Sequence, residues 1–209
     1  MAGKGVGPAY RIQTSRLVLR CWDPRDAAML KKAIDANLDH LRPWMDWAQD
    51  EPRPLEQKIE MLRRARAQFD LNQDYPYGIF NLEETRVIGG SGLHARIGIG
   101  ALEIGYWIDQ EFLNLGLATE AAAGLTRVAF EVEGVRRVEI HCDPNNMRSA
   151  RIPEKLGFTL EVIRRKFLPL SGDRFRDTMI WTLLDSEYPS SNSAGVSIEA
   201  FDVIGRKLV

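Results

Sequence analysis

The order of apolar and polar positions along the chain predicts both helices and strands. The run from 16 to 21 alternates between the two kinds of residue, which predicts an edge-type strand. Asp23 and Pro24 then predict a helix start, because an acidic cap and a proline at the first helical position favour one. Pro54 opens a second, longer helical pattern. Its buried side is predicted to hold Ile59, Leu62, Ala65 and Phe69.

Beyond residue 74 the pattern changes to that of strands. Three apolar runs separated by short turns predict an antiparallel meander over 77–82, 87–94 and 101–108. Apolar residues at helical spacing follow over 116–132, and 137–142 has the pattern of a strand. Because strand, helix and strand in this order form a crossover, part of the sheet should be parallel. A further helix and a hairpin are predicted at 146–156, 158–168 and 175–184.

Length and composition limit the class of protein. The 209 residues are enough for one domain with a substantial core, which we place at 10–185, between a flexible segment, 1–9, and a tail, 186–209. A formal net charge of -1 gives no reason to expect a nucleic-acid partner. Two cysteines predict neither a disulfide framework nor a metal site. Since no stretch resembles a signal peptide or a membrane span, we expect a cytoplasmic protein without a membrane partner.

A helix that opens on small residues is the first candidate for chemistry. A strand ends at Ile108, and the next helix begins around Gly116 and Ala118. Small residues allow a diphosphate to approach the free N–H groups at a helix N-terminus, and Thr119 would add a hydroxyl. A helix start that packs tightly on the sheet favours the same small residues, so this motif alone leaves both interpretations open.

A second motif makes the first more specific. The stretch 146–158 combines an asparagine cap, a terminal glycine and a phenylalanine. With it, five stretches resemble in their order one family, and they read TSRLVLR (14–20), LRPWM (41–45), EIGYWI (103–108), GLATEA (116–121) and NMRSARIPEKLGF (146–158). The chain resembles the GNAT superfamily of acyl-CoA-dependent N-acetyltransferases over most of 11–184. Within it, the chain is most similar to the enzymes that acetylate the N-termini of ribosomal proteins.

The resemblance implies a fold and a cosubstrate. The expected fold is an α/β (α+β) GNAT fold, with a mixed, mostly antiparallel seven-stranded sheet that is splayed in the centre and flanked by helices. The splay should lie between the strand ending at Ile108 and the one ending at Cys142. The pantetheine arm of acetyl-CoA, the expected cosubstrate, would enter there without any metal. A homodimer is a further possibility that the family suggests.

The resemblance also implies which residues bind the cofactor. The backbone of Tyr106, Trp107 and Ile108 would pair with the pantetheine amides as another strand would. The diphosphate would lie on the loop formed by Leu113, Asn114, Leu115, Gly116, Leu117, Ala118 and Thr119. Asn146 and Ser149 would lie near the thioester and are expected to be catalytic. Leu113 and Asn114 depart from the family, which usually has Arg or Gln and often Gly there.

Catalysis needs a neutral amine, a polarised carbonyl and a route for the proton. Glu103 is the candidate base, acting through water; the alternative is an outward-facing strand glutamate in a surface pair. The N–H of Ile108 is a candidate oxyanion donor. Pro153 stands where many family members carry a tyrosine that protonates the thiolate, which leaves Ser149 as the candidate acid.

The expected acceptor is a protein N-terminal α-amine. Residues expected to bind it are Trp44, Trp47, His94 and Glu103. Each has a structural alternative: Trp47 as an apolar plug over the sheet, and His94 as a structural histidine, since the sequence shows no convincing partner for it. A polyamine or aminoglycoside acceptor, and a non-catalytic acyl-CoA sensor, are the alternative functions.

Overall fold

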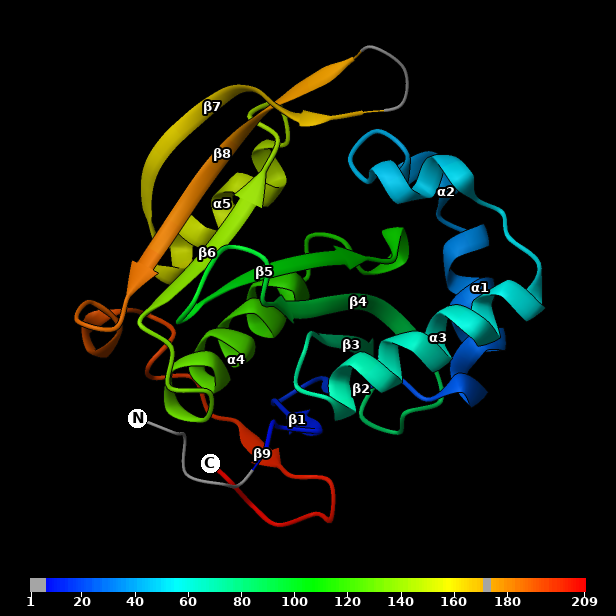
Figure 1. The fold of residues 1–209 in the computed structure, drawn as a ribbon, viewed down its shortest axis with the longest axis horizontal. Coiled ribbons are helices and arrows are strands. Elements are labelled where there is room, and N and C mark those ends of the chain that lie inside the picture. Colours follow the sequence, from blue (N-terminus) through cyan, green and yellow to red (C-terminus); the bar gives the residue numbers. More distant parts are fainter. Residues whose placement is uncertain (1–6, 171–173) are drawn as a thin grey trace.

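Nine strands form one sheet in the computed structural model, which describes residues 7–170 and 174–209. Their order across the sheet is β7-β8-β6-β5-β4-β3-β2-β1-β9. The strands are β1 (Arg11–Gln13), β2 (Val18–Cys21), β3 (Tyr75–Phe80), β4 (Val87–His94), β5 (Ala101–Ile108), β6 (Arg137–Cys142), β7 (Thr159–Pro169), β8 (Phe175–Leu184) and β9 (Glu199–Phe201). The helices are α1 (Ala27–Asp35), α2 (Leu38–Leu41), α3 (Leu55–Asp70), α4 (Leu117–Glu131) and α5 (Met147–Leu156). Figure 1 shows α1, α2 and α3 grouped at one side, away from α4 and α5.

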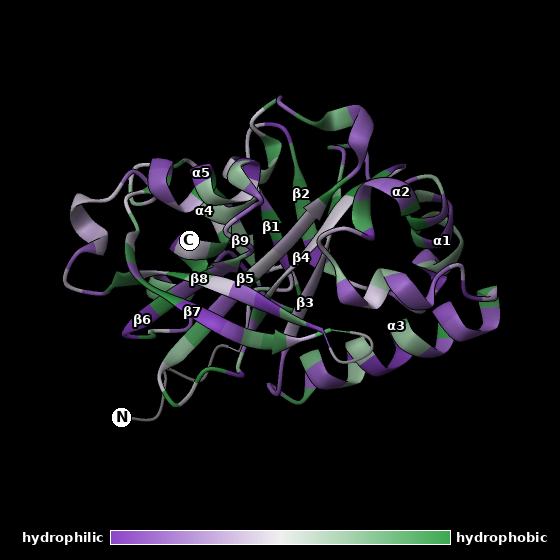
Figure 2. Cartoon of the chain, turned by 90° about the horizontal axis from the view of Figure 1, so that it is seen from above, coloured by the Kyte–Doolittle hydropathy of each residue, from purple (hydrophilic) through white to green (hydrophobic). Residues whose placement is uncertain are grey.

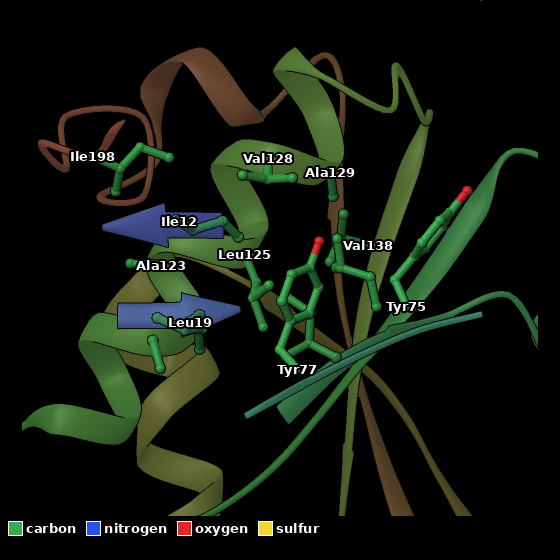
Figure 3. Packing of buried hydrophobic residues seen from close by; sticks show 14 of the residues in the cluster. Ile12, Leu19, Tyr75, Tyr77, Ala123, Leu125, Val128, Ala129, Val138 and Ile198 are labelled. Carbon is green, nitrogen blue, oxygen red and sulfur yellow. The ribbon is translucent and has the colours of Figure 1, made fainter. Parts of the chain in front are cut away.

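The main core lies between α4 and the sheet. Figure 3 shows Tyr77, Leu125, Val128 and Val138 converging there, and all four side chains are fully buried. A smaller apolar cluster lies where α1 and α3 meet the sheet and includes Phe80. Much of α3 is hydrophilic (Figure 2), because only one side of it packs on the protein. No helix among the described residues is both long and apolar enough to cross a membrane.

The sheet has nine strands where seven were predicted. The additional strands are short: β1 and β9 have three residues each and pair antiparallel to each other. The prediction of an edge strand over 16–21 is also wrong, since β2 lies between β1 and β3. The tail supplies β9, and Ala200 is fully buried within it. A strand of three residues is too short to show an alternating pattern of apolar and polar positions, so the sequence pattern could not reveal β1 and β9.

The N-terminal segment 1–9 is described only from residue 7 onward. Residues 1–6 of this predicted flexible segment lie outside the described residues. Pro8 and Ala9 are buried, and the carbonyl of Ala9 accepts a hydrogen bond of 2.6 Å from the hydroxyl of Tyr77. The described end of the segment is therefore packed on the main core.

The sheet opens between β5 and β6, where the sequence predicted it. These parallel strands pair from Ala101 with Arg137 to Ile104 with Ile140. Pairing stops there, although β5 continues to Ile108. The predicted crossover and the meander of β3, β4 and β5 are confirmed as well.

The buried side of α3 differs from the predicted one at one turn. Leu62 and Phe69 are buried as predicted, but Ile59 is 42% exposed. The neighbouring Lys58 is fully buried instead, with its ammonium on the carboxylate of Glu51. The ion pair makes burial of a lysine acceptable, and periodicity cannot reveal such a partner.

Glu133, just beyond α4, gives a pH-dependent contribution to stability. Burial raises the pKa of Glu133 to about 7, and a hydrogen bond with Tyr75 only partly opposes the rise. Since the unfolded carboxyl ionises at lower pH, the native state binds more protons between the two values, and stability falls as pH rises toward 7. We expect Glu133→Gln to be more stable than the parent above pH ~7 and similar to it below pH ~4.

Urea titrations across this pH range test the expectation. Glu154→Gln, on the exposed part of α5, is the matched control and should leave the pH profile unchanged. A Glu133→Gln variant whose stability follows the parent at every pH would show that Glu133 ionises alike in both states.

Candidate active site

A cavity of about 990 Å³ reaches into the opening between β5 and β6. Eight of the residues that the sequence singled out line it: Trp44, Trp47, His94, Glu103, Tyr106, Trp107, Asn146 and Ser149. Ile108 and the loop 113–119 do not line this cavity. The structure thus brings the expected acceptor-binding and catalytic residues together, and leaves the expected diphosphate loop beyond the cavity wall.

The backbone of β5 offers free amide groups to the opening. The N–H of Asp109 donates to the carbonyl of Ile88, at 2.8 Å. Because bonded and non-bonded positions alternate along an antiparallel pair, Trp107 turns its backbone toward β4, whereas Tyr106 and Ile108 turn theirs toward β6. Past Ile104 these groups have no β6 residue opposite them. They form the edge to which an extended chain, such as pantetheine, can add.

Alternation along β5 also sends successive side chains to opposite faces. Tyr106 points toward α5, where its hydroxyl lies 3.2 Å from both Oγ and the carbonyl oxygen of Ser149. The side chain of Asn146 caps α5 by accepting from the N–H of Ser149, at 3.1 Å. Burial raises the pKa of Tyr106, so its hydroxyl stays protonated. Two hydroxyl groups therefore meet at the α5 side of the opening.

The glycines of β4 make room for two rings on the other face. A Cβ at Gly90 would lie 2.6 Å from Nε1 of Trp107. One at Gly92 would lie 2.6 Å from Nε2 of His94. These contacts explain the unusual glycine content of β4: a side chain at either position would displace a ring that lines the cavity.

His94 has the carboxylate partner that the sequence did not reveal. Its Nδ1 lies 2.8 Å from Oδ2 of Asp74, which also accepts from the N–H of Ala95 at 3.2 Å through Oδ1. Asp74 immediately precedes β3, and the β3–β4 pairing places it beside the end of β4. The interpretation of His94 as a histidine without a partner is wrong. Only the pairing of distant strands could have shown it.

Glu103 is buried and ion-paired, not turned outward into a surface pair. It is 6% exposed, and the guanidinium of Arg96 donates to its two oxygens at 2.6 and 2.8 Å. On its other side Nδ1 of His141 lies 3.6 Å away, while Nε2 of His141 lies 2.6 Å from Glu139. Burial opposes ionisation of Glu103, but Arg96 and His141 outweigh it and hold the pKa of this carboxyl below its ordinary value.

Trp44 and Trp47, between α2 and α3, form a tryptophan wall of the cavity. The rings of Trp47 and Trp107 meet edge to face with centroids 6.3 Å apart. The carbonyl of Trp44 accepts a hydrogen bond of 2.6 Å from the guanidinium of Arg176 on β8, which ties this wall to the far side of the cavity. Trp47 is 38% exposed and packs on a ring of β5, so both its role in acceptor binding and its role as an apolar plug over the sheet stay predictions.

The loop 113–119 makes a tight turn into α4. Asn114 and Gly116 have positive φ angles of 61° and 78°, which turn the chain into α4. Leu113 packs against the main core, which accounts for an apolar residue there. Its expected role in binding the diphosphate stays a prediction.

Arg16 holds this loop in position, a contact that no pattern in the sequence predicted. Its Nη1 donates to the carbonyl of Leu115 at 2.9 Å, and Nε donates to Glu120 at 2.6 Å. The guanidinium thereby bridges Leu115 to the first turn of α4, where the first N–H groups have no partner within the helix. A positive charge thus lies beside the loop although Leu113 carries none.

Neither a nucleophilic cysteine nor a metal cluster is evident at the cavity. Cys142 lines it, but burial raises the pKa of its thiol to about 11, which makes it a poor nucleophile. Within 7–170 and 174–209, no group of three or more His, Cys, Asp or Glu residues is placed to hold a metal ion.

Comparisons with known proteins show the family of the chain. The family model for the acetyltransferase (GNAT) domain matches residues 16–159. The chain is 26% identical over 186 residues to the [Ribosomal protein uS5]-alanine N-acetyltransferase of Escherichia coli (strain K12), which covers 87% of this chain and 94% of that protein.

Solved structures show the same fold. RimL, a ribosomal L7/L12 alpha-N-protein acetyltransferase in complex with coenzyme A, superposes with a TM-score of 0.74 at 23% identity, over 82% of this chain and 95% of that one. The ribosomal-protein-S5-alanine acetyltransferase from Vibrio fischeri gives 0.73 at 20% identity, over 85% and 98%.

The chain belongs to the GNAT family of acetyltransferases. It is an N-acetyltransferase, and acetyl-CoA is its acetyl donor.

The contact between Arg16 and the loop predicts a selective loss of affinity. Since a hydrogen bond to a charged group contributes roughly 1.5–3 kcal/mol, we expect Arg16→Gln to raise the Kd of CoA about tenfold or more. Pantetheine lacks the diphosphate, so its Kd should not change. Titration calorimetry with both ligands measures the difference.

Arg11→Gln is the matched control, because Arg11 pairs with Glu84 elsewhere on the protein. An equal loss of affinity for CoA and pantetheine in Arg16→Gln would place the role of Arg16 outside diphosphate binding.

Proposed function

We propose that the enzyme transfers the acetyl group to the N-terminal α-amine of a protein, by direct attack of the amine on acetyl-CoA in a ternary complex. The observation that carries this proposal is a large, aromatic-walled cavity without excess negative charge. The names of the relatives, which include acetyltransferases of ribosomal proteins, support the same acceptor class. A ribosomal protein as acceptor would place the reaction in the cytoplasm.

The balance of charged side chains in the cavity favours a peptide acceptor over a polycation. The acidic side chains that line the cavity are Asp46, Glu51, Asp74, Glu103 and Asp143. The cationic ones are Arg53, Lys58, Arg64, Arg96 and Arg176. Several are matched at close range, as Glu51 is to Lys58 and Glu103 to Arg96. A polyamine carries several ammonium groups and needs an excess of carboxylates, whereas a peptide N-terminus brings one amine and an extended backbone.

The chemistry of the amine favours the same acceptor. An α-amine has a pKa of roughly 7.7–8.0, so part of it is neutral at neutral pH. A lysine amine, at about 10.4, needs a stronger local field to lose its proton. The ion pair of Glu103 with Arg96 and the hydrogen bond between Asp74 and His94 occupy the nearest carboxylates.

The proposed reaction uses both faces of β5. Pantetheine amides pair with Tyr106 and Ile108, the thioester reaches the start of the opening, and a backbone N–H of β5 polarises its carbonyl. The amine approaches over Trp47, on the face that carries Glu103. The sulfur leaves toward the hydroxyls of Tyr106 and Ser149, which stabilise it by hydrogen bonds. Since Cys142 is a poor nucleophile, the acetyl group passes directly to the amine.

Glu103 has a positioning role in this proposal. With a lowered pKa and two hydrogen bonds from Arg96, it is a weak proton acceptor at neutral pH. Its carboxylate can orient the amine through a water molecule while it holds Arg96 and His141 in place.

An acceptor panel tests the proposal. We expect thiol release from acetyl-CoA with peptides that begin with alanine or serine, and mass spectrometry should place the acetyl group on the α-amine. The same peptides with a blocked N-terminus are the matched control and should not react. Turnover of a polyamine in preference to every peptide would contradict the proposed acceptor.

A further inference from the structure

We infer that His94, held by Asp74, takes the proton from the attacking amine. This inference rests on the proposed function for its reaction, in which an amine attacks acetyl-CoA, but not for the identity of the acceptor. The side chains of His94 and Asp74 are 21% and 27% exposed, and both residues line the cavity. The pair is therefore shielded but open to a bound amine.

Asp74 determines which nitrogen of the His94 imidazole carries the proton. The carboxylate of Asp74 lies 2.8 and 3.1 Å from Nδ1 of His94. An ionised carboxylate only accepts hydrogen bonds, so neutral His94 keeps its proton on Nδ1. The lone pair is then on Nε2, and the Asp74 charge stabilises the imidazolium that forms when Nε2 takes a proton.

The other ring nitrogen of His94, Nε2, lies over the glycines of β4 and β5. The ring covers Gly92, and Nε2 is 3.6 Å from the position that a Cβ of Gly105 would occupy. Gly105 is the first residue of β5 beyond the last pair with β6, Ile104 with Ile140. The basic atom thus lies on the acceptor face, at the start of the opening into which the thioester is proposed to reach.

His94 differs from the other acid–base groups that line the cavity. Charged and titratable side chains that line the same cavity come from several elements: Lys58 and Arg64 on α3, Arg96 after β4, Glu103 on β5 and His141 on β6. Glu103 accepts two hydrogen bonds from Arg96, and Nε2 of His141 lies 2.6 Å from the carboxylate of Glu139. Among these acid–base groups, His94 alone has one carboxylate partner on Nδ1 and a second nitrogen, Nε2, that lies over Gly92 and Gly105.

The step balances without any further reagent. The amine nitrogen forms a bond to the thioester carbon, and its proton passes to Nε2 of His94. The carbon–sulfur bond breaks, and its electron pair leaves on the sulfur of CoA. Hydrogen bonds from Tyr106 and Ser149 stabilise the thiolate, which takes a proton from water. His94 then releases its proton to solvent.

Turnover of histidine variants tests the inference. Because general base catalysis contributes roughly 10²–10⁴-fold, we expect His94→Gln to lower kcat by roughly a hundredfold or more, with the KM for acetyl-CoA unchanged. Glu103→Gln should lower kcat by a smaller factor. Imidazole added to His94→Ala should restore turnover in proportion to its concentration. His40→Gln, at a histidine that does not line the cavity, is the matched control and should be as active as the wild type.

Two kinetic results would overturn the inference. One is a His94→Gln variant with wild-type kcat. The other is a His94→Ala variant that imidazole does not restore and that has a raised acceptor KM, since His94 would then bind the acceptor rather than take its proton. Wild-type failure with every peptide in the panel refutes only the proposed acceptor, because these ratios are measured with whichever amine reacts.

The tautomer of His94 gives a test without turnover. A long-range ¹H–¹⁵N spectrum of the labelled protein resolves its three histidines. We expect neutral His94 to carry its proton on Nδ1, and Asp74→Asn to abolish this preference. A proton on Nε2 of neutral His94 in the wild type would overturn the inference, because that atom could then accept none.

Discussion

The site depends on one interruption of backbone pairing. β5 and β6 are bonded from Ala101 with Arg137 to Ile104 with Ile140, and then separate. A buried sheet rarely leaves N–H and C=O groups unpaired, since each one costs free energy. Here the groups of Tyr106 and Ile108 can be satisfied by the amides of pantetheine, and the separation is therefore the proposed binding site. The cavity, the tryptophan wall and the meeting of hydroxyls at α5 all surround this opening.

The alternation of β5 distributes two kinds of chemistry from this one opening. Tyr106 reaches α5 and the hydroxyl of Ser149, where a leaving sulfur can be stabilised. Glu103 and Trp107 face the other side, beside His94 and the tryptophan wall, where an amine can enter. A shift of one residue in register would exchange the two faces, so the proposed mechanism requires the strict pairing of β5 with β4. The glycines of β4 allow that pairing while two rings lie over them.

Local signals in the sequence were enough for most of the fold. The meander, the crossover, the cap at Asn146 and the glycine at the end of α5 each depend on neighbouring residues, and all are confirmed. The place of the opening followed from the family resemblance. The three-residue strands β1 and β9 were missed because they show no period and are stabilised by pairing with each other. Lys58 was missed because its burial depends on Glu51.

The unpredicted parts of the site share one cause, which is contact between residues far apart in the chain. Asp74 and His94 are joined by the β3–β4 hairpin, and Arg16 reaches Glu120 across 104 residues.

The account as a whole is tested most directly by a crystal structure with a bisubstrate analogue, in which an acetyl bridge links the sulfur of CoA to the α-amine of a peptide. It predicts pantetheine bonded to Tyr106 and Ile108, with the peptide on the face of His94 and Trp47. Pantetheine bound outside the opening between β5 and β6 would contradict it.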